Sequence, residues 1–364
     1  MRDELARYHR QMLLPGFGEE GQRRLRESTV LVLGCGALGS IAADMLARAG
    51  AGHLVIVDRD FVDLTNLQRQ VLFDEQDAAN ALPKAEAARR KLATINSGVR
   101  VTAIIDDINH TNIEGFAKDA DILVDGLDNF ETRYLANDVA VRHALPYVYG
   151  AAVGTTGMGF SILPHGDGTA PWEDTERGNL ATPCFRCLFE EAPPPGSSPT
   201  CDTVGVMGSI VGIVANFEVA ETLKILTGNY ARVSRTLLNL DLWGNELMQL
   251  QVDNAYEKGN CPACKQRRFD YLDGKAGSAA VSLCGRDAVQ LRHRQGADGI
   301  DLATLAGRLR EHGDVSVNDF MLRAHITEGN KRYELTLFAD GRAIVKGTTE
   351  ADVARAVYAR YVGN

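Results

Sequence analysis

The feature that most constrains the fold of this chain is a glycine-rich turn between an apolar strand and a helix. Thr29–Leu33 is an apolar run that is typical of a buried strand. Gly34, Gly36 and Gly39 follow it at the spacing G-x-G-x-x-G, and Ser40–Ala49 then shows the apolar spacing of a helix. Such glycines let the backbone approach phosphate oxygens, which the N–H groups of the following helix can bind. The pattern predicts a nucleotide phosphate site, and a tight turn without a ligand is the alternative interpretation.

A second strand and an acidic residue extend this pattern. The apolar run His53–Val57 ends in Asp58, which lies 19 residues after Gly39. In dinucleotide-binding folds, an acid near this position binds the ribose hydroxyls. Asp58 is therefore a candidate ribose ligand, and the structural alternative is an acid that caps a loop at the strand end. These residues do not distinguish NAD from ATP.

Strands and helices continue to alternate along the chain. We expect a helix at Lys84–Ile95, strands at Arg100–Ile105 and Ile122–Asp125, a helix at Asn129–His143 and a strand at Tyr147–Ala152. A long polar loop then precedes a helix at Val204–Thr227 and a strand at Leu237–Leu242. Such alternation is typical of a mainly parallel sheet with helices on both faces. The predicted fold class is therefore α/β and Rossmann-like.

Length and charge divide the chain. Its 364 residues exceed one typical domain of ~100–150 residues. Residues 1–267 have a formal net charge of −10, and residues 268–364 one of +1. We therefore expect a main domain at 1–267, a linker at 268–279 and a small α+β module at 280–364. The module should contain a hairpin, because Asp340-Gly341 separates two apolar runs.

The composition of the whole chain excludes several classes of protein. The formal net charge is −9, and a basic footprint is lacking, so nucleic acid is not an expected partner. The first residues lack the apolar region of a signal peptide, and each apolar run is too short or too interrupted to span a membrane. We expect a soluble, cytoplasmic protein. In that reducing compartment, seven cysteines indicate metal binding or catalysis instead of disulfides.

Polar residues gather beyond the predicted strand ends, where open α/β sheets bind ligands. They are Asp58, Asp60, Asn66, Gln68, Arg69, Lys84 and, after a later strand, Asp128. Basic side chains suit adenylyl transfer, because negative charge builds on the α-phosphate and on the leaving pyrophosphate. Arg69 and Lys84 are the candidates for that role, and Asp128 is the candidate ligand of Mg²⁺. Taken singly, each of them resembles a solvated surface charge, but as a set at the strand ends they favour the functional interpretation.

Four cysteines form two C-x-x-C pairs, Cys184 with Cys187 and Cys261 with Cys264. Pairs of this kind coordinate Zn²⁺ tetrahedrally through their thiolates, and four protein ligands leave no open position. We therefore predict a structural zinc site. Two unrelated redox or buried pairs are the alternative.

A further cysteine, Cys201, precedes the predicted helix at Val204–Thr227. A thiol near a helix N-terminus can have a lowered pKa and act as a nucleophile. Cys201 is therefore a candidate catalytic residue, and a small buried side chain is the alternative. Cys35, inside the glycine turn, and Cys284 are expected to be packing residues.

Taken together, these motifs resemble a known family. They are Arg7-Tyr8-His9-Arg10-Gln11, the Gly34–Gly39 turn, Asn66-Leu67-Gln68-Arg69-Gln70, Pro83-Lys84, Asp128-Asn129, both cysteine pairs and Cys201. Over roughly residues 5–267, the chain resembles the ThiF/MoeB/HesA family of bacterial relatives of ubiquitin-activating enzymes. The resemblance implies a homodimer that binds ATP with Mg²⁺ and adenylates the C-terminal glycine of a small ubiquitin-like or sulfur-carrier protein ending in Gly-Gly. Pyrophosphate would leave, and a cysteine or another sulfur nucleophile would then attack the acyl adenylate.

The resemblance also implies roles for single residues. Asp58 would bind ribose, Asp128 would support Mg²⁺ and the reacting centre, and Arg10 would reach the triphosphate of the partner subunit. Arg69 and Lys84 would contact the phosphates, in a pocket that Asn66 and Gln68 line. Both cysteine pairs would hold zinc, and Cys201 matches a cysteine that receives the activated carrier in some relatives.

The last 100 residues depart from the shortest family pattern. The segment around Cys284 lacks the arginine loop expected of a rhodanese module, so docking of a downstream sulfur-transfer or conjugating protein is the expected role. The pathway stays open between sulfur transfer and a bacterial ubiquitin-like conjugation pathway. Two further functions are compatible with parts of the pattern, an NAD-dependent oxidoreductase and a non-catalytic scaffold that binds a ubiquitin-like protein.

Overall fold

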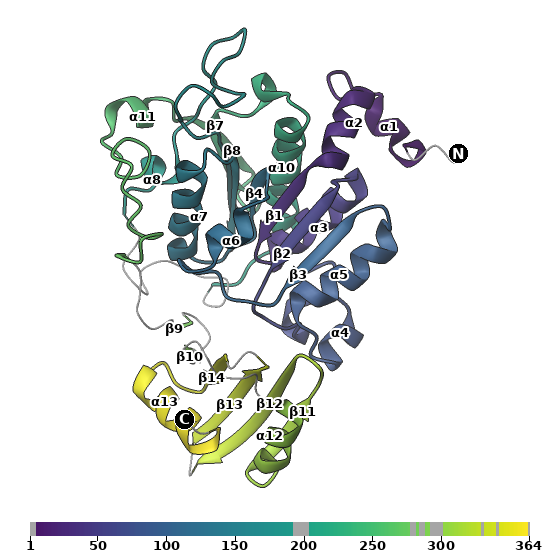
Figure 1. Ribbon diagram of the computed structural model, residues 1–364, viewed down its shortest axis with the longest axis vertical. Helices are drawn as coiled ribbons and strands as arrows, with labels where there is room; N and C mark the ends of the chain where they lie inside the picture. Colours follow the sequence, from purple (N-terminus) through teal and green to yellow (C-terminus); the bar gives the residue numbers. More distant parts are fainter. Residues whose placement is uncertain are drawn as a thin grey trace. The chain divides into compact units, whose positions relative to one another are not determined.

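The computed structural model describes residues 5–191, 204–276, 282–283, 288–291, 301–328, 331–339 and 342–362. These residues form two compact units. The first contains residues 5–191 and 204–276, and the second lies within residues 282–362 (Figure 1).

An eight-stranded sheet forms the centre of the first unit. Its strands are β1 (Thr29–Leu33), β2 (His53–Val57), β3 (Arg100–Ile104), β4 (Ile122–Asp125), β5 (Tyr147–Val153), β6 (Thr156–Ile162), β7 (Thr236–Asp241) and β8 (Glu246–Gln251). They lie in the order β3-β2-β1-β4-β5-β6-β7-β8. Neighbours from β3 to β5 are parallel, and neighbours from β5 to β8 are antiparallel.

Helices cover both faces of this sheet (Figure 1). The long ones are α3 (Ala37–Ala49), α5 (Lys84–Ile95), α7 (Phe130–Arg142) and α10 (Gly208–Leu226). The shorter ones are α1 (His9–Met12), α2 (Gly18–Glu27), α4 (Glu75–Ala79), α6 (Ile113–Ala117), α8 (Phe185–Leu188) and α11 (Asn254–Lys258), with 3-10 turns η1 (Ala6–Tyr8), η2 (Leu64–Asn66) and η3 (Tyr230–Arg232). The arrangement confirms the predicted Rossmann-like α/β class.

The two faces of β1 show how the core is divided. Leu31 and Leu33 are fully buried in the cluster that packs beneath α7, together with Tyr134 of that helix. Val32 points the other way, toward Gly39 of α3. Because successive strand residues face opposite sides, a continuous apolar run is needed where both faces are covered.

The strand order creates a site for a ligand. From β1 the chain crosses to β2 and later returns to β4 on the opposite side of β1. In open α/β sheets, the crevice at such a reversal, beyond the carboxyl ends of the strands, is where ligands bind. The segments after β1, β2 and β4 begin at Gly34, Asp58 and Gly126, so all three reach this edge.

Helix α10 begins later than its apolar spacing predicts. The expected start was Val204, but the helix runs from Gly208. Val206 instead forms an isolated parallel bridge with Gly154, and the N–H of Met207 donates to the Gly154 carbonyl at 2.9 Å. Pairing with the end of β5 therefore holds this segment extended before the helix starts.

The described residues of the second unit form an antiparallel sheet and two helices. Its strands are β9 (Ser282–Leu283), β10 (Ala288–Leu291), β11 (Gly313–Val317), β12 (Met321–Glu328), β13 (Lys331–Phe338) and β14 (Ala343–Lys346), in the order β11-β12-β13-β14-β10-β9. The helices are α12 (Leu302–Leu309) and α13 (Ala351–Tyr361). Alternate residues of β12, Leu322, Ala324 and Ile326, pack in one core with both helices. Asp340 and Gly341, the expected hairpin turn, lie outside the described residues.

The first unit extends beyond residue 267 into the segment expected to be a linker. Phe269 and Leu272 are buried in the core of the unit. The Asp138 carboxylate of α7 accepts hydrogen bonds from the N–H groups of Tyr271 at 3.0 Å and Leu272 at 3.3 Å. Residues 268–276 therefore pack as part of this unit.

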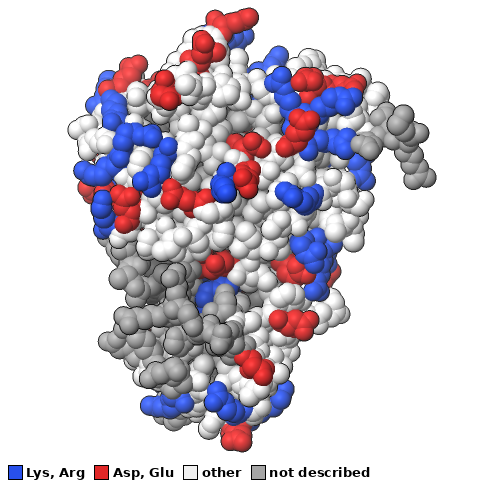
Figure 2. Space-filling view, in the orientation of Figure 1, with Lys and Arg blue, Asp and Glu red and all other residues white. Residues whose placement is uncertain are grey.

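Charged side chains of both signs intermingle on the face shown in Figure 2. The described helices include none with the length and apolarity needed to cross a bilayer.

Candidate functional site

The glycine turn after β1 is held so closely that two positions require glycine. Gly34 has a φ of +87°, and a Cβ on it would lie 2.5 Å from the Gly126 carbonyl oxygen. A Cβ on Gly39 would lie 2.0 Å from the Gly34 carbonyl oxygen. Gly36 is the N-cap residue of α3, whose first N–H groups have no partners within the helix. The turn can therefore bind a phosphate group through its backbone.

Asp58 binds the glycine turn to the end of β2. Its Oδ2 accepts the N–H of Cys35 at 2.6 Å, and its Oδ1 accepts the N–H of Asp60 at 2.7 Å. Burial raises the pKa of Asp58, while the nearby Lys84 ammonium opposes that rise. Burial and the Asp58 charge also raise the pKa of the Cys35 thiol, so Cys35 is not a thiolate nucleophile at neutral pH.

Further charged side chains lie beyond the ends of the strands. Lys84, the first residue of α5, places its Nζ 3.0 Å from Asp60 Oδ2. Arg59 places Nη1 2.6 Å from Asp107 Oδ1, beyond β3. Burial opposes the charge of Arg59, but Asp107, Asp60 and Asp128 raise its pKa. The sequence-predicted residues Asp58, Asp60 and Lys84 are thus brought together.

Asp128 reaches the same edge from β4. It is exposed, and its Oδ1 accepts the side-chain amide of Asn129 at 3.1 Å. Its charge acts on Arg59, which links it to the group formed by Asp58, Asp60 and Lys84. A carboxylate of this kind suits a hard cation such as Mg²⁺.

Arg59 is a charged residue of the site that we did not predict from the sequence. It is four-fifths buried, with 21% of its side chain exposed. A signal was present, since Arg59 lies between Asp58 and Asp60, and successive residues after a strand share the edge of the sheet. Taken alone, however, an arginine in a loop does not differ from a surface arginine.

The segment around η2 supplies the other polar candidates. Asn66 is buried, and its carbonyl accepts the N–H groups of Arg69 at 3.1 Å and Gln70 at 3.0 Å. Arg69 donates from Nη1 to the Thr65 carbonyl at 3.1 Å, within its own loop. The Gln68 carbonyl oxygen lies against Gly208, the first residue of α10.

One predicted residue, Arg10, is not brought to this group. Arg10 lies exposed on α1, beside Tyr8, whose ring packs against Gly50 at the far end of α3 from the glycine turn. Gln11 fixes α1 there, because its amide donates to the Ala49 carbonyl at 3.0 Å. Cys201 lies outside the described residues.

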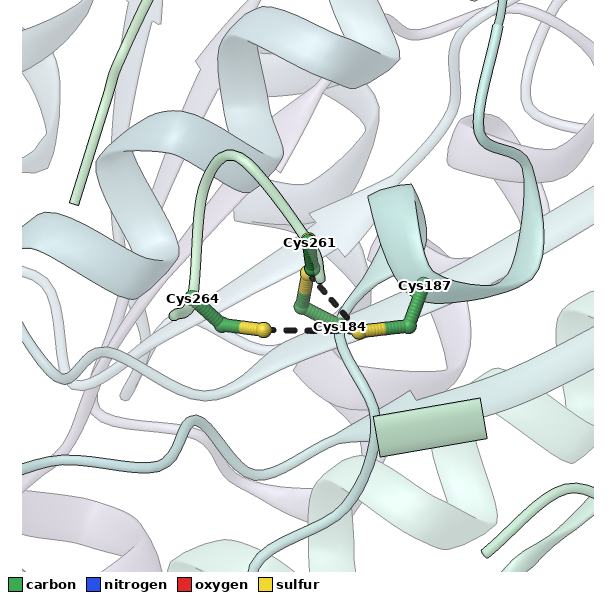
Figure 3. Close-up of side chains that lie close together, drawn as sticks. All are labelled: Cys184, Cys187, Cys261 and Cys264. Atoms are coloured by element: carbon green, nitrogen blue, oxygen red, sulfur yellow. Dashed lines mark hydrogen bonds between the residues drawn. The ribbon is translucent and has the colours of Figure 1, made fainter. Parts of the chain in front are cut away.

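The four paired cysteines converge, as Figure 3 shows. Their sulfur atoms all lie within 4.8 Å of one another, with separations of 3.8 Å (Cys184–Cys187), 3.6 Å (Cys184–Cys261) and 3.3 Å (Cys187–Cys264). A disulfide requires about 2.05 Å. Four thiolates about 2.3 Å from one tetrahedral zinc lie about 3.8 Å apart, so the set fits a zinc ion.

The cysteine cluster is fixed to the first unit through α7. Cys184 is the N-cap residue of α8, and the next residue, Phe185, is fully buried. The N–H of Phe185 donates to Asn137 Oδ1 of α7 at 2.8 Å. The other pair, Cys261 and Cys264, follows α11, so the cluster joins two distant segments of the chain.

The fold and the reversal of the strand order define an α/β protein of the Rossmann-like class. A family model described as the ThiF family matches residues 8–263, and the chain belongs to this family. The predicted ThiF/MoeB/HesA membership is thereby confirmed.

Curated relatives show how far the similarity extends. The sulfur carrier protein ThiS adenylyltransferase of Bacillus subtilis is 38% identical over 359 residues, covering 98% of this chain and 99% of the relative. The sulfur carrier protein adenylyltransferase of Thermus thermophilus is 38% identical over 263 residues, covering 72% of this chain and 92% of the relative. The SAMP-activating enzyme E1 of Haloferax volcanii is 35% identical over 284 residues, covering 77% of this chain and 97% of the relative. The predicted enzyme class, an adenylyltransferase, is confirmed by these relatives.

A solved structure supports the fold. The crystal structure of E. coli MccB with MccA-N7isoASN has a TM-score of 0.57 and 24% identity, covering 71% of this chain and 74% of that chain. At this identity the likeness concerns the fold alone.

Proposed function

We propose that this protein uses ATP and Mg²⁺ to adenylate the C-terminal glycine of a small sulfur-carrier protein that ends in Gly-Gly. The observation that carries the proposal is the position of Lys84. It places a buried ammonium group at the strand-end edge, 3.0 Å from Asp60 and close to Asp58, which accepts the N–H of Cys35 in the glycine turn. Charge of this kind stabilises the α-phosphate as the carrier carboxylate attacks it.

The strand-end residues have different roles in the proposed reaction. The backbone N–H groups at the start of α3 and the side chains of Lys84 and Arg69 hold the phosphates, and Asp58 and Asp60 hold the ribose. Asp128 would hold Mg²⁺, which would neutralise phosphate charge. A carrier carboxylate oxygen bonds to the α-phosphorus as the bond from that phosphorus to the bridging oxygen breaks. Pyrophosphate leaves with that oxygen, and alignment by these groups supplies much of the rate.

The position of Arg10 supports a homodimer. Helix α3 has 13 residues and is therefore about 20 Å long. The glycine turn lies at its N-terminus, whereas Tyr8, two residues from Arg10, packs at its C-terminal Gly50. Arg10 is thus held away from the glycine turn of its own chain. We propose that it contacts the triphosphate bound by the partner subunit.

The cysteine cluster and the second unit complete the proposal. Cys184, Cys187, Cys261 and Cys264 would hold a structural zinc ion, because their sulfur atoms fit one tetrahedral shell and leave no open position. For the second unit, we propose docking of a partner protein that acts after adenylation. Cys201 is proposed as the acceptor of the activated carrier.

The extent of the similarity favours one class of carrier. The match to the ThiS adenylyltransferase covers 98% of this chain and so includes the second unit. We therefore propose a ThiS-type sulfur carrier as the substrate. The 35% identity with the SAMP-activating enzyme E1 supports a second candidate, activation of a ubiquitin-like protein for conjugation to other proteins.

Pyrophosphate exchange into ATP tests the proposed function. We expect exchange with a ThiS-type carrier and none with the same carrier lacking its terminal Gly-Gly. Asp128→Ala should reduce exchange strongly, and exchange at the wild-type rate in this variant would refute the assigned site. Asp253→Ala is the matched control, because Asp253 is an exposed acid that pairs with Arg235 at 3.0 Å, far along the chain from the strand-end residues. Carrier joined to lysines of other proteins would favour the conjugation candidate.

A further inference from the structure

A buried ion pair lies beneath the loop that carries Asp128. Asp125, the last residue of β4, is fully buried, and Arg133 of α7 is only 6% exposed. Arg133 Nε donates to Asp125 Oδ2 at 3.0 Å, and the Tyr147 hydroxyl donates to the same oxygen at 2.5 Å. Although burial opposes its charge, the Asp125 carboxylate raises the pKa of Arg133 above its ordinary value.

This ion pair holds both backbone polar groups of one residue. Asp125 Oδ1 accepts the N–H of Leu127 at 2.8 Å. Arg133 Nη2 donates to the Leu127 carbonyl at 2.7 Å and to the Gly150 carbonyl of β5 at 3.0 Å. Leu127 directly precedes Asp128, so the side chains of Asp125 and Arg133 fix the loop immediately before the candidate Mg²⁺ ligand.

The free-energy cost of burying this ion pair indicates that it does more than stabilise the fold. Taking two charges out of water costs several kcal/mol per ion, and apolar side chains of similar volume often stabilise a core as well or better. What an apolar pair could not do is hold the Leu127 N–H and carbonyl in one orientation. Arginine suits this task, because its planar guanidinium presents several donors in a fixed geometry, whereas a lysine ammonium does not.

We propose that Arg133 is a positioning residue for adenylation, which acts with Asp125 to hold Asp128 in its reactive place. The proposal rests on the proposed function. Arg133 touches no substrate; it acts through the backbone of Leu127. A displacement of about 1 Å at a reacting group can cost about 100-fold in rate, so loosening this loop should slow the reaction strongly.

Arg133→Lys tests the proposal, because lysine keeps the positive charge but lacks the planar guanidinium that donates several hydrogen bonds in a fixed geometry. We expect kcat of carrier-dependent pyrophosphate exchange to fall about 10- to 100-fold. The KM for ATP should change less than kcat, because neither Lys84 nor a residue of the glycine turn is substituted. In an Asp128→Asn background, Arg133→Lys should cause much less further loss of kcat. Both substitutions remove the same contribution, which is that of a correctly placed Asp128 carboxylate. Equal losses in the two backgrounds, or a folded Arg133→Lys protein with wild-type kcat, would overturn the proposal.

A second measurement does not depend on activity. Amide hydrogen exchange of a peptide covering residues 126–130 should be faster in Arg133→Lys, while a peptide covering β2 should be unchanged. An unchanged loop peptide would overturn the proposal even if the wild type adenylates no carrier, whereas absence of wild-type activity alone would refute the proposed function. If Arg133→Lys fails to fold, Tyr147→Phe removes one hydrogen bond to Asp125 and leaves both charges. It should give a smaller change in the same direction in both measurements, and no change in either would overturn the proposal.

Discussion

Lys84 Nζ lies 3.0 Å from Asp60 Oδ2, and only 3% of the Lys84 side chain is exposed. Lysine is a mobile, strongly hydrated residue on most surfaces. Here the first turn of α5 and the carboxylate hold it away from water. A cation held in this way does not need to reorganise when negative charge develops beside it, which is the condition for strong electrostatic catalysis.

Replacing Lys84 should therefore impair chemistry more than folding. Lys84→Met keeps much of the buried side-chain volume and should reduce carrier-dependent pyrophosphate exchange by about 100- to 1,000-fold. Arg89→Met is the matched control on the same helix, because Arg89 is half-exposed and pairs with Glu86 at 2.7 Å. Arg89→Met should retain near wild-type exchange, and equal loss in both variants would show that α5 acts only structurally. Thermal unfolding of both proteins checks that they are folded.

Removing one cysteine of the paired set should release the metal. Cys261→Ser should lower zinc from about one ion per chain and destabilise the first unit by at least about 3 kcal/mol, because metal-binding energy contributes to folding. Elemental analysis and thermal unfolding measure the two effects. Cys35→Ala is the control, since Cys35 lies in the glycine turn, and it should keep its zinc. A wild-type protein that is folded and free of zinc would contradict the assignment.

Asp138 should make stability depend on pH. Burial raises the pKa of Asp138 to about 7, with the N–H groups of Leu272 and Tyr271 opposing the rise. In the unfolded chain its pKa is about 3.9. The folded state therefore binds the proton more tightly, so the stabilisation is complete below about pH 4 and is lost as the pH rises toward 7. At about 1.4 kcal/mol per pKa unit, the loss is at most about 4 kcal/mol.

Asp138→Asn should remove this dependence. The asparagine oxygen can accept both N–H groups, and the side chain stays neutral, so the melting temperature should vary less between pH 4 and 7 and exceed that of wild type at pH 8. Asp273→Asn is a useful contrast, because the pKa of Asp273 is lowered by its hydrogen bond to Lys275. That variant should lose stability above about pH 4 instead. A wild-type pH profile in Asp138→Asn would show that Asp138 is ionised in the fold.

A methyl group on Gly126 should disturb the glycine turn. Its Cβ would lie 2.3 Å from the Gly34 carbonyl oxygen, so one backbone must shift. We expect Gly126→Ala to weaken ATP binding at least about 10-fold and to destabilise the protein by about 1–3 kcal/mol. Gly115→Ala is the matched control, because Gly115 lies in α6 with no atom within 4 Å of the added Cβ. That change should be neutral or stabilising by up to about 1 kcal/mol.

Elements with a clear apolar pattern could be predicted from the sequence, and elements without one could not. The predicted bounds of α5 and β4 agree with the structure, since a clear helical spacing marks the first and a short apolar run marks the second. We did not predict β8, all of whose residues are exposed, because a strand with neither face buried has no alternation. We also did not predict β6, whose Gly157 and Gly159 interrupt its apolar pattern at positions where Val214 and Phe217 of α10 lie against them.

The residues of the candidate site could also be predicted only in part from the sequence. That Asp58, Asp60 and Lys84 would come together followed from their positions relative to strand ends, because parallel strands direct their carboxyl ends to one edge. The ion pair of Asp125 and Arg133 did not follow. Arg133 lies within a helix whose sequence is mixed in polarity, and only the packing of β5 against α7 shows that this arginine is buried.

The position of Arg10 at the far end of α3 has a consequence for mixed assemblies. In the proposed homodimer, each active site combines Lys84 of one chain with Arg10 of the other, so Arg10→Ala and Lys84→Met should each be inactive alone. Subunits exchanged between the two variants would form hybrids in which one site carries both substitutions and the other carries neither. Random mixing would restore about a quarter of wild-type activity, which is intersubunit complementation from two inactive parents. A single chain that completed its own site would show no such recovery.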